Sequence, residues 1–230
     1  MIRRLCFMIL LLGVMGLGQP VMGSESGNDQ TAIIQAMGSQ SQALVDALIT
    51  KDQAQAEQHY QLLKTNLDHL HSLTAHMDFN ERRTRELFTA YSWMRLIAID
   101  MHEHAWTGAA IAANQMGGEI IRFTDFTTLT LRDVAWMGYL SRDVMLLSME
   151  DMQGNMQAID LRRGELSETW KRVREDLIQD FRNKTLVMRG DQIINSIQQA
   201  DSSKALIELS GDEHKFVDEI EHLLASAGSV

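Results

Sequence analysis

Apolar residues recur along the chain at alternating steps of four and three positions, and the two longest runs define the expected architecture. Steps of three and four keep residues on one face of an α-helix, so each run predicts a helix packed along a partner. The phase of the second run passes Gly154 and Gly164 without a shift, which predicts one continuous helix, with 153–155 as the place where a break would fall. The first seam comprises Leu87, Tyr91, Met94, Ala98, Met101, Ala105, Gly108 and Ala112, and the second comprises Met145, Met149, Met152, Met156, Ile159, Arg163, Leu166, Trp170, Val173 and Leu177.

The remaining helix boundaries follow from polar turns and capping residues. A helix near 29–50 and another near 53–77 are separated by a polar turn at Thr50-Lys51-Asp52. Short polar side chains cap helix N-termini, and glycine favours helix ends. The expected signals are Asn80 as an N-cap, a stop at Gly117-Gly118, a capping box at Thr130-Leu131-Arg132-Asp133, and two short helices bracketed by Gly190 and by Ser210-Gly211-Asp212-Glu213.

Proline is almost absent from the chain, which indicates an almost wholly helical fold. The only proline is Pro20, whereas about ten are expected in a chain of this size at the usual ~5%. Proline costs ~3 kcal/mol inside a helix, so its absence suits long uninterrupted helices. The sequence predicts an all-α fold: an elongated up-down bundle of five to seven antiparallel helices joined by short loops, two of them heptad-patterned and about 35 and 50 residues long.

The N-terminus has the pattern of a secretory signal peptide. Arg3 and Arg4 precede an apolar run over 5–18, and Val21-Met22-Gly23 offers small residues at a cleavage site. The run is shorter than the ~20 residues of a membrane-spanning helix, which favours cleavage over a retained anchor. We therefore expect a signal peptide over 1–23, a single helical-bundle domain over 24–230, no membrane span after cleavage, and a location in the periplasm or outside the cell.

Cleavage also changes the available chemistry and the charge. The only cysteine, Cys6, leaves with the signal, so the mature chain cannot form disulfides, thiolate metal sites, c-type haem attachments or a cysteine nucleophile. Two of the 21 basic residues leave as well, and 19 basic against 31 acidic residues give a net charge of −12. A negative surface repels phosphate backbones, so neither nucleic acid nor an anionic membrane surface is an expected partner.

Histidines paired with acidic residues at helical spacing suggest a metal site. Di-metal bundles use carboxylate-x-x-His pairs, together with glutamates from two further helices, for which the sequence offers no pair. The alternative is that these histidines lie on the surface or at helix ends. The pairs are Asp68 with His71, Asp100 with His104, and Glu219 with His222.

Methionine is abundant, and Met145, Met149, Met152 and Met156 share one face of the second seam. Thioether sulfurs bind Cu(I), a soft ion. Because the same stripe continues into Ile159, methionine as a flexible filler of helix–helix contacts is the competing interpretation.

One hairpin resembles a known family. The stretch from Leu44 to His71, with Asp52-Gln53-Ala54-Gln55-Ala56-Glu57 and Leu63-Lys64-Thr65, is similar to the final hairpin of periplasmic b-type cytochromes of the four-helix type. That resemblance implies a b-type haem held by an early methionine and a late histidine. Met37 with His71 or His222 would be the ligands in this chain.

The functional hypotheses follow from what remains. No phosphate-binding glycine loop, zinc-protease motif or nucleophile elbow is present, and an enzyme is not expected. The stretch 117–130 lacks a helical period, and its Glu119, Arg122 and Asp125 are expected to border a ligand pocket. We favour an exported sensor, adaptor or chaperone-like protein without a cofactor, which binds an envelope protein or a small ligand and could associate with itself through its seams. The alternative is a carrier of copper, iron or haem that uses histidine and methionine.

Overall fold

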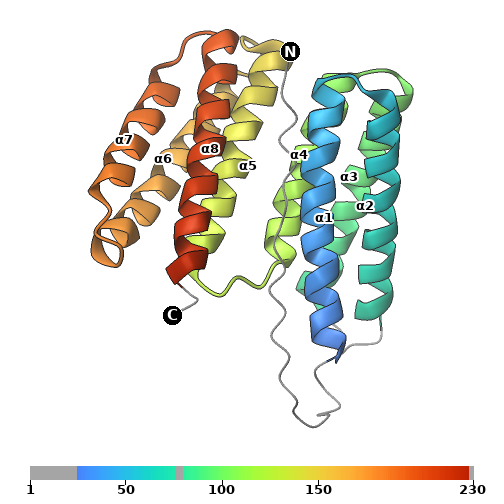
Figure 1. Cartoon of the computed structure of the whole chain (residues 1–230). Coiled ribbons are helices and arrows are strands. Elements are labelled where there is room, and N and C mark those ends of the chain that lie inside the picture. Colours follow the sequence, from blue (N-terminus) through green and yellow to red (C-terminus); the bar gives the residue numbers. More distant parts are fainter. Residues whose placement is uncertain (1–24, 76–79, 228–230) are drawn as a thin grey trace.

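The computed structural model describes residues 25–75 and 80–227, and every regular element in these ranges is an α-helix (Figure 1). The predicted all-α class is confirmed. The predicted signal peptide lies outside the described residues. No described helix has an apolar stretch long enough to cross a membrane. The helices are α1 (Glu25–Ile49), α2 (Gln53–Thr74), α3 (Glu81–His102), α4 (Trp106–Phe123), α5 (Leu129–Asp151), α6 (Met156–Gln179), α7 (Lys184–Gln199) and α8 (Ser203–Ala227).

The helices form two bundles that stand side by side, α1–α4 in one and α5–α8 in the other (Figure 1). Helix α1 packs on α2 and α4, and α3 packs on α4. In the second bundle α5 packs on α6 and on α8, and α7 also packs on α6 and on α8. The α4–α5 pair joins the bundles. Consecutive helices run antiparallel, as the up-down prediction requires (Figure 1).

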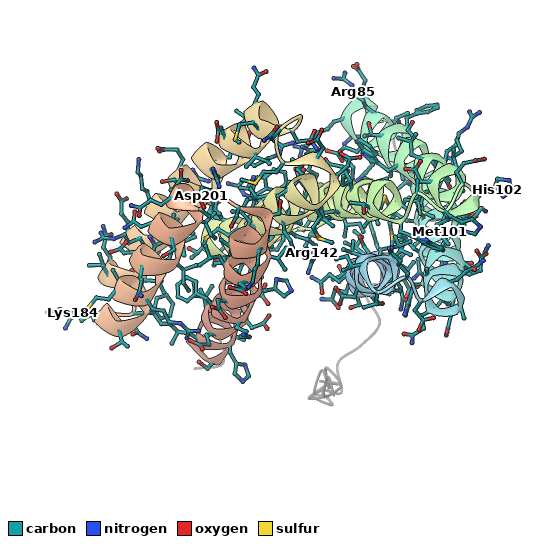
Figure 2. All side chains as sticks on the ribbon, turned by 90° about the horizontal axis from the view of Figure 1, so that it is seen from above. Arg85, Met101, His102, Arg142, Lys184 and Asp201 are labelled. Carbon is teal, nitrogen blue, oxygen red and sulfur yellow. The ribbon has the colours of Figure 1, made fainter. Side chains whose placement is uncertain are left out.

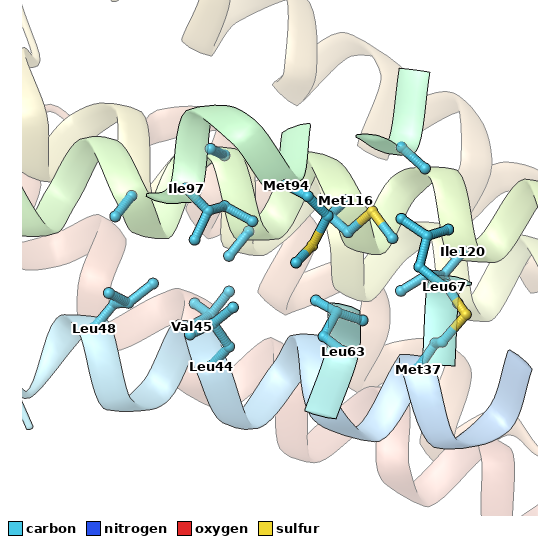
Figure 3. Close-up of a cluster of buried hydrophobic side chains, with 14 of the residues drawn as sticks. Met37, Leu44, Val45, Leu48, Leu63, Leu67, Met94, Ile97, Met116 and Ile120 are labelled. Carbon is cyan, nitrogen blue, oxygen red and sulfur yellow. The ribbon is translucent and has the colours of Figure 1, made fainter. Parts of the chain in front are cut away.

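Each bundle has its own apolar core. In the first core, α1 and α2 point leucines and a methionine towards Met94 and Ile97 of α3 and Met116 of α4 (Figure 3). The second core is built from α5–α8 around Trp170 and Phe216, whose rings meet edge to face at 5.4 Å. Helix α5 serves both cores, since Leu146 is buried in the first and Leu140 in the second. The prediction of one domain over 24–230 stays a prediction.

The first seam does not form one long helix, and that prediction is wrong. Helix α3 ends at His102 and the chain reverses over 103–105 before α4 begins at Trp106. His104 adopts the left-handed conformation with φ 58°, and the N–H of Ala105 donates to the carbonyl of Asp100 at 2.8 Å. Both features are typical of the C-terminal end of an α-helix. A heptad count cannot detect this reversal, because the connection happens to preserve the phase.

The second seam is also divided, at the place where the sequence allowed a break. Helix α5 ends at Asp151, whose carboxylate accepts hydrogen bonds from the N–H groups of Gln153 (3.1 Å) and Gly154 (3.0 Å). A side-chain Cβ at residue 154 would lie 2.4 Å from that carboxylate, so any other residue there would displace the Asp151 side chain from these hydrogen bonds. The seam residues of α6 from Ile159 to Leu177 are buried as predicted. Within residues 25–75 and 80–227 the chain therefore forms eight helices of moderate length, instead of five to seven with two very long ones.

Several helix boundaries in the structure differ from the predicted ones. Asn80 caps α3 as predicted, through Arg83 N–H at 3.0 Å, but α4 continues past Gly117-Gly118 to Phe123. The N-cap of α5 is Thr128, two residues before the predicted box. Gly190 lies inside α7 and does not end a helix. Glycine is needed there for packing, because a Cβ would sit 2.2 Å from the Trp170 ring. The predicted box 210–213 lies inside α8.

A buried polar cluster links α5 and α8. Ser141 and Ser210 share a hydrogen bond of 2.9 Å between their hydroxyls. Glu213 is fully buried, and neither carboxylate oxygen has a hydrogen-bond partner in the described part of the chain. Burial raises the pKa of Glu213 to about 8, whereas burial and the charge of Arg142 lower the pKa of His214 to about 4. Glu213 is therefore protonated and His214 neutral near pH 7.

Replacement of His104 by glycine tests the first turn. Glycine adopts positive φ without the ~1 kcal/mol cost borne by other residues, so His104→Gly should raise the free energy of unfolding by about 1 kcal/mol. If residue 104 lay inside a continuous helix, the same substitution would instead lower the free energy of unfolding by about 1 kcal/mol. Urea unfolding followed by circular dichroism measures the difference, and Arg95→Gly in the exposed middle of α3 is the destabilising control. A loss of stability in both variants would contradict the hairpin.

The α5–α8 cluster predicts a pH dependence of stability. Between pH 4.5 and 8 the folded protein keeps the Glu213 proton that the unfolded chain releases, so Glu213 lowers the free energy of unfolding as pH rises. His214 acts in the opposite sense, but only between about pH 4 and 6.5. We therefore expect stability to fall from pH 6.5 to 8 in wild type.

Urea unfolding of two variants tests whether Glu213 causes this pH dependence. Glu213→Gln removes the titrating group and should flatten the curve between pH 6.5 and 8, while Glu208→Gln, on the exposed face of α8, should follow wild type. An unchanged slope in Glu213→Gln would show that another group controls it.

Candidate functional site: an arginine-lined cleft

The loop 124–128 borders a cleft of about 530 Å³ at one end of the α4–α5 pair. Helices α3, α4, α5 and α6 all contribute to its walls. Its charged lining is mainly basic, although the chain as a whole is acidic. The charged side chains are Arg82, Arg122, Arg132 and Arg172, opposed by Asp125 and Asp133.

The N-terminus of α5 forms one wall of this arginine-lined cleft. The hydroxyl of Thr128 accepts a hydrogen bond from the N–H of Leu131 at 3.2 Å, which caps the helix. In the same first turn, the hydroxyl of Thr130 donates to a carboxylate oxygen of Asp176 on α6 at 2.5 Å. These bonds fix the first turn of α5 against α6, and the positive end of the α5 dipole faces the region of the arginines.

Asp133 positions two of the arginines. Its side chain is buried and accepts hydrogen bonds from Arg172 Nε at 2.5 Å and from Arg132 Nη2 at 3.2 Å. The hydrogen bond to Asp133 raises the pKa of Arg172. Arg172 also donates to the Thr169 hydroxyl at 3.2 Å and to the Glu168 carbonyl at 3.3 Å. Arg172 is thus held on several sides, whereas Arg132 uses only one of its donors in a bond to the described residues.

Arg122 reaches the cleft from the last turn of α4. It forms an ion pair with Glu119 one turn earlier, and its guanidinium lies 5.5 Å from the centre of the Trp136 ring. Glu119 is buried, and burial raises the pKa of its carboxyl against the opposing effect of Arg122. The aromatic ring and the carboxylate together hold Arg122 in place, as expected for a cation over an indole face.

The arrangement can bind an anion. A guanidinium presents five N–H donors in a planar fork that matches carboxylate and phosphate oxygens. Arg82 and Arg132 each make one hydrogen bond to a carboxylate in the described structure, which leaves further donors for a ligand. These donors make the binding of a carboxylate or phosphate group one chemistry that this lining supports.

The three predicted pocket residues lie near this cleft in different roles. Arg122 and Asp125 line it, and Asp125 also borders a second hollow between α2 and α3. Glu119 is buried behind the cleft and contacts it through Arg122. The sequence did not point to Arg82, Arg132 or Arg172, which are separated by up to 90 positions. No local pattern joins them, because only the packing of α3 and α6 against the α4–α5 loop brings them together.

The predicted metal pairs lie on separate elements. Asp68 accepts hydrogen bonds from Lys64 and Tyr91, and His71 Nδ1 lies 3.3 Å from the same tyrosine hydroxyl. His104 occupies the α3–α4 turn beyond Asp100, and Glu219 pairs with Arg189 while His222 is exposed on α8. Within residues 25–75 and 80–227, no group of three or more histidine, aspartate or glutamate side chains is placed to hold a metal ion.

The methionine stripe is divided by the α5–α6 turn. Met145 and Met149 pack against the first core, Met152 packs against the second, and Met156 is exposed. The four sulfurs therefore do not line one face of a single helix.

The residues named by the cytochrome resemblance are also separated. Met37 is fully buried in the first core, whereas His71 is exposed on α2 and His222 is exposed on α8 of the other bundle (Figure 3).

Comparison of the chain with protein-family models, with curated proteins and with solved structures finds no match.

Proposed function

We propose that this protein is an exported, non-enzymatic helical protein that binds a small organic anion carrying two or more acidic groups in the arginine-lined cleft. The observation that carries the proposal is the convergence of four arginines from four helices on one cleft of an acidic chain. Export by the segment 1–23 is part of the proposal, as is a sensor or adaptor role that does not require a cofactor.

Electrostatics support a specific anion site in preference to a diffuse basic surface. A net charge of −12 on the mature chain repels anions in general, so binding depends on short-range contacts with the arginines. Arg172 and Arg122 are already oriented by Asp133, Glu119 and Trp136, which reduces the entropy lost when a ligand binds. Several forks favour a ligand with more than one acidic group, such as a tricarboxylate or a phosphate ester.

Titration calorimetry with citrate and with inorganic phosphate tests the site. We expect citrate to bind more tightly than phosphate and its affinity to fall between low and moderate salt. Arg132→Gln should weaken citrate binding at least tenfold, because a charge-assisted hydrogen bond contributes ~1.5–3 kcal/mol. Trp136 fluorescence should change when citrate contacts Arg122, and this change should be absent in Trp136→Phe.

Arg85→Gln provides the matched control. Arg85 lies on α3 one turn from Arg82 and pairs with Glu81 at 2.8 Å, but it does not line the cleft (Figure 2). This variant should bind citrate like wild type. The proposal fails if neither anion binds more strongly than chloride, or if Arg85→Gln and Arg132→Gln weaken binding equally.

Export has its own test. Fractionation of native cells followed by mass measurement of the purified protein should find it in the envelope fraction with residues 1–23 removed. A full-length protein in the cytosolic fraction would contradict the proposed export while leaving the anion site open to calorimetry.

A further inference from the structure

A second cleft, of about 170 Å³, lies between the two bundles and is separate from the arginine-lined cleft. Helices α1 and α4 form one wall, and α5 and α8 form the other. Arg142 lies between the ribbons of α8 and α1 when the molecule is viewed from above (Figure 2). Among the described residues, Arg142 and the acidic pair Asp218 and Glu221 line this inter-bundle cleft.

Glycines keep this inter-bundle cleft open. Gly38, Gly117 and Gly138 line it from three different helices, and none has positive φ. Each costs its helix about 1 kcal/mol relative to alanine. A Cβ on Gly38 or Gly138 would meet its nearest neighbour at 3.8 Å, which is ordinary contact. Neither the backbone nor close packing therefore requires glycine at these two positions, and what glycine provides is open space.

Arg142 lines this space with a guanidinium that has donors beyond its hydrogen bond to His214. Its Nη2 donates to Nε2 of His214 at 2.9 Å, which fixes the guanidinium on the floor of the cleft. No carboxylate in the described ranges forms an ion pair with it, although Asp46, Glu213 and Asp218 are near enough to interact electrostatically. Burial lowers the pKa of Arg142, because the guanidinium has lost part of its contact with water. A partly desolvated guanidinium with vacant donors is a site for a carboxylate.

Acidic groups lie on the α8 side of the same cleft. Asp218 and Glu221 are one helical turn apart and both line it. Neither carboxylate forms an ion pair or a side-chain hydrogen bond within the described structure. Desolvation and the neighbouring charge of Asp218 raise the pKa of Glu221, and desolvation also raises the pKa of Asp218. Two unpaired carboxyl groups side by side attract a cationic group of a ligand.

We propose that the inter-bundle cleft binds a small zwitterion of the α-amino acid class, with its carboxylate on Arg142 and its ammonium group on Asp218 and Glu221. The volume of the inter-bundle cleft, about 170 Å³, equals that of about five or six water molecules, which suits a small amino acid. Apolar side chains of Ile120, Ile121 and Val217 complete the lining and favour an aliphatic substituent.

Calorimetry and thermal unfolding of the full chain test the proposal. The probes are the common α-amino acids added one at a time and, for valine, the two matched compounds valinamide and 3-methylbutanoate, each of which lacks one charge. We expect an aliphatic amino acid such as valine to bind and raise the unfolding midpoint. Valinamide and 3-methylbutanoate should each bind at least tenfold more weakly.

Two variants tie binding to the cleft. Arg142→Gln should abolish amino-acid binding. Because this variant removes a partly buried charge, the double variant Gly38→Ala with Gly138→Ala supplies an independent test: two added methyl groups fill the cleft while improving helix propensity, so the unfolding midpoint should not fall but binding should weaken at least tenfold. Arg85→Gln should bind like wild type, and excess citrate should not compete.

Failure has a clear form. The proposal is wrong if no α-amino acid binds, if the singly charged analogues bind as tightly as valine, or if the double glycine variant keeps the wild-type affinity. Competition by citrate would also overturn it, since that would place both ligands in the arginine-lined cleft.

Discussion

The contact between α4 and α5 is the interaction on which the rest of the structure depends. At its centre the buried carboxylate of Asp143 accepts hydrogen bonds from Asn114 (3.3 Å), Gln115 (2.8 Å) and Arg162 (2.7 Å). Tyr139 adds a bond from its hydroxyl to Gln115 at 2.9 Å. A buried charge is tolerated only when it is paired and hydrogen-bonded, so this set of contacts fixes the register of the two helices. Both clefts lie along this contact.

Small residues allow α4 to occupy the central position. Ala109, Ala110, Ala112 and Ala113 are all buried, and a Cβ on Gly118 would lie 3.1 Å from the Tyr139 ring. Neighbouring helices can therefore approach α4 from three sides, namely α1, α3 and α5. The consequence for function is that α4 contributes to both clefts, with Arg122 in one and Asn114 in the other.

Charge is distributed unevenly in relation to this junction. The chain is acidic, yet the end of the α4–α5 pair collects four arginines, and a fifth, Arg142, lies between the bundles. Most of these arginines are oriented by a carboxylate, an aromatic ring or a histidine. Such held side chains lose little entropy when they bind a ligand, which is why pre-positioned arginines suit recognition better than mobile surface ones.

The sequence by itself determined the helical class, the positions of α1 and α2, the start of α3 and the buried face of α6, because apolar spacing, capping residues and proline content act locally. It also pointed to the stretch 117–130, in which Arg122 and Asp125 line the arginine-lined cleft. It could not distinguish a long helix from a hairpin, since the reversals at His104 and Gly154 preserve the heptad phase. Nor could it assemble the clefts. Arg82 and Arg172, like Arg142 and Asp218, meet only when distant helices pack, and long-range packing leaves no periodic signal in the chain.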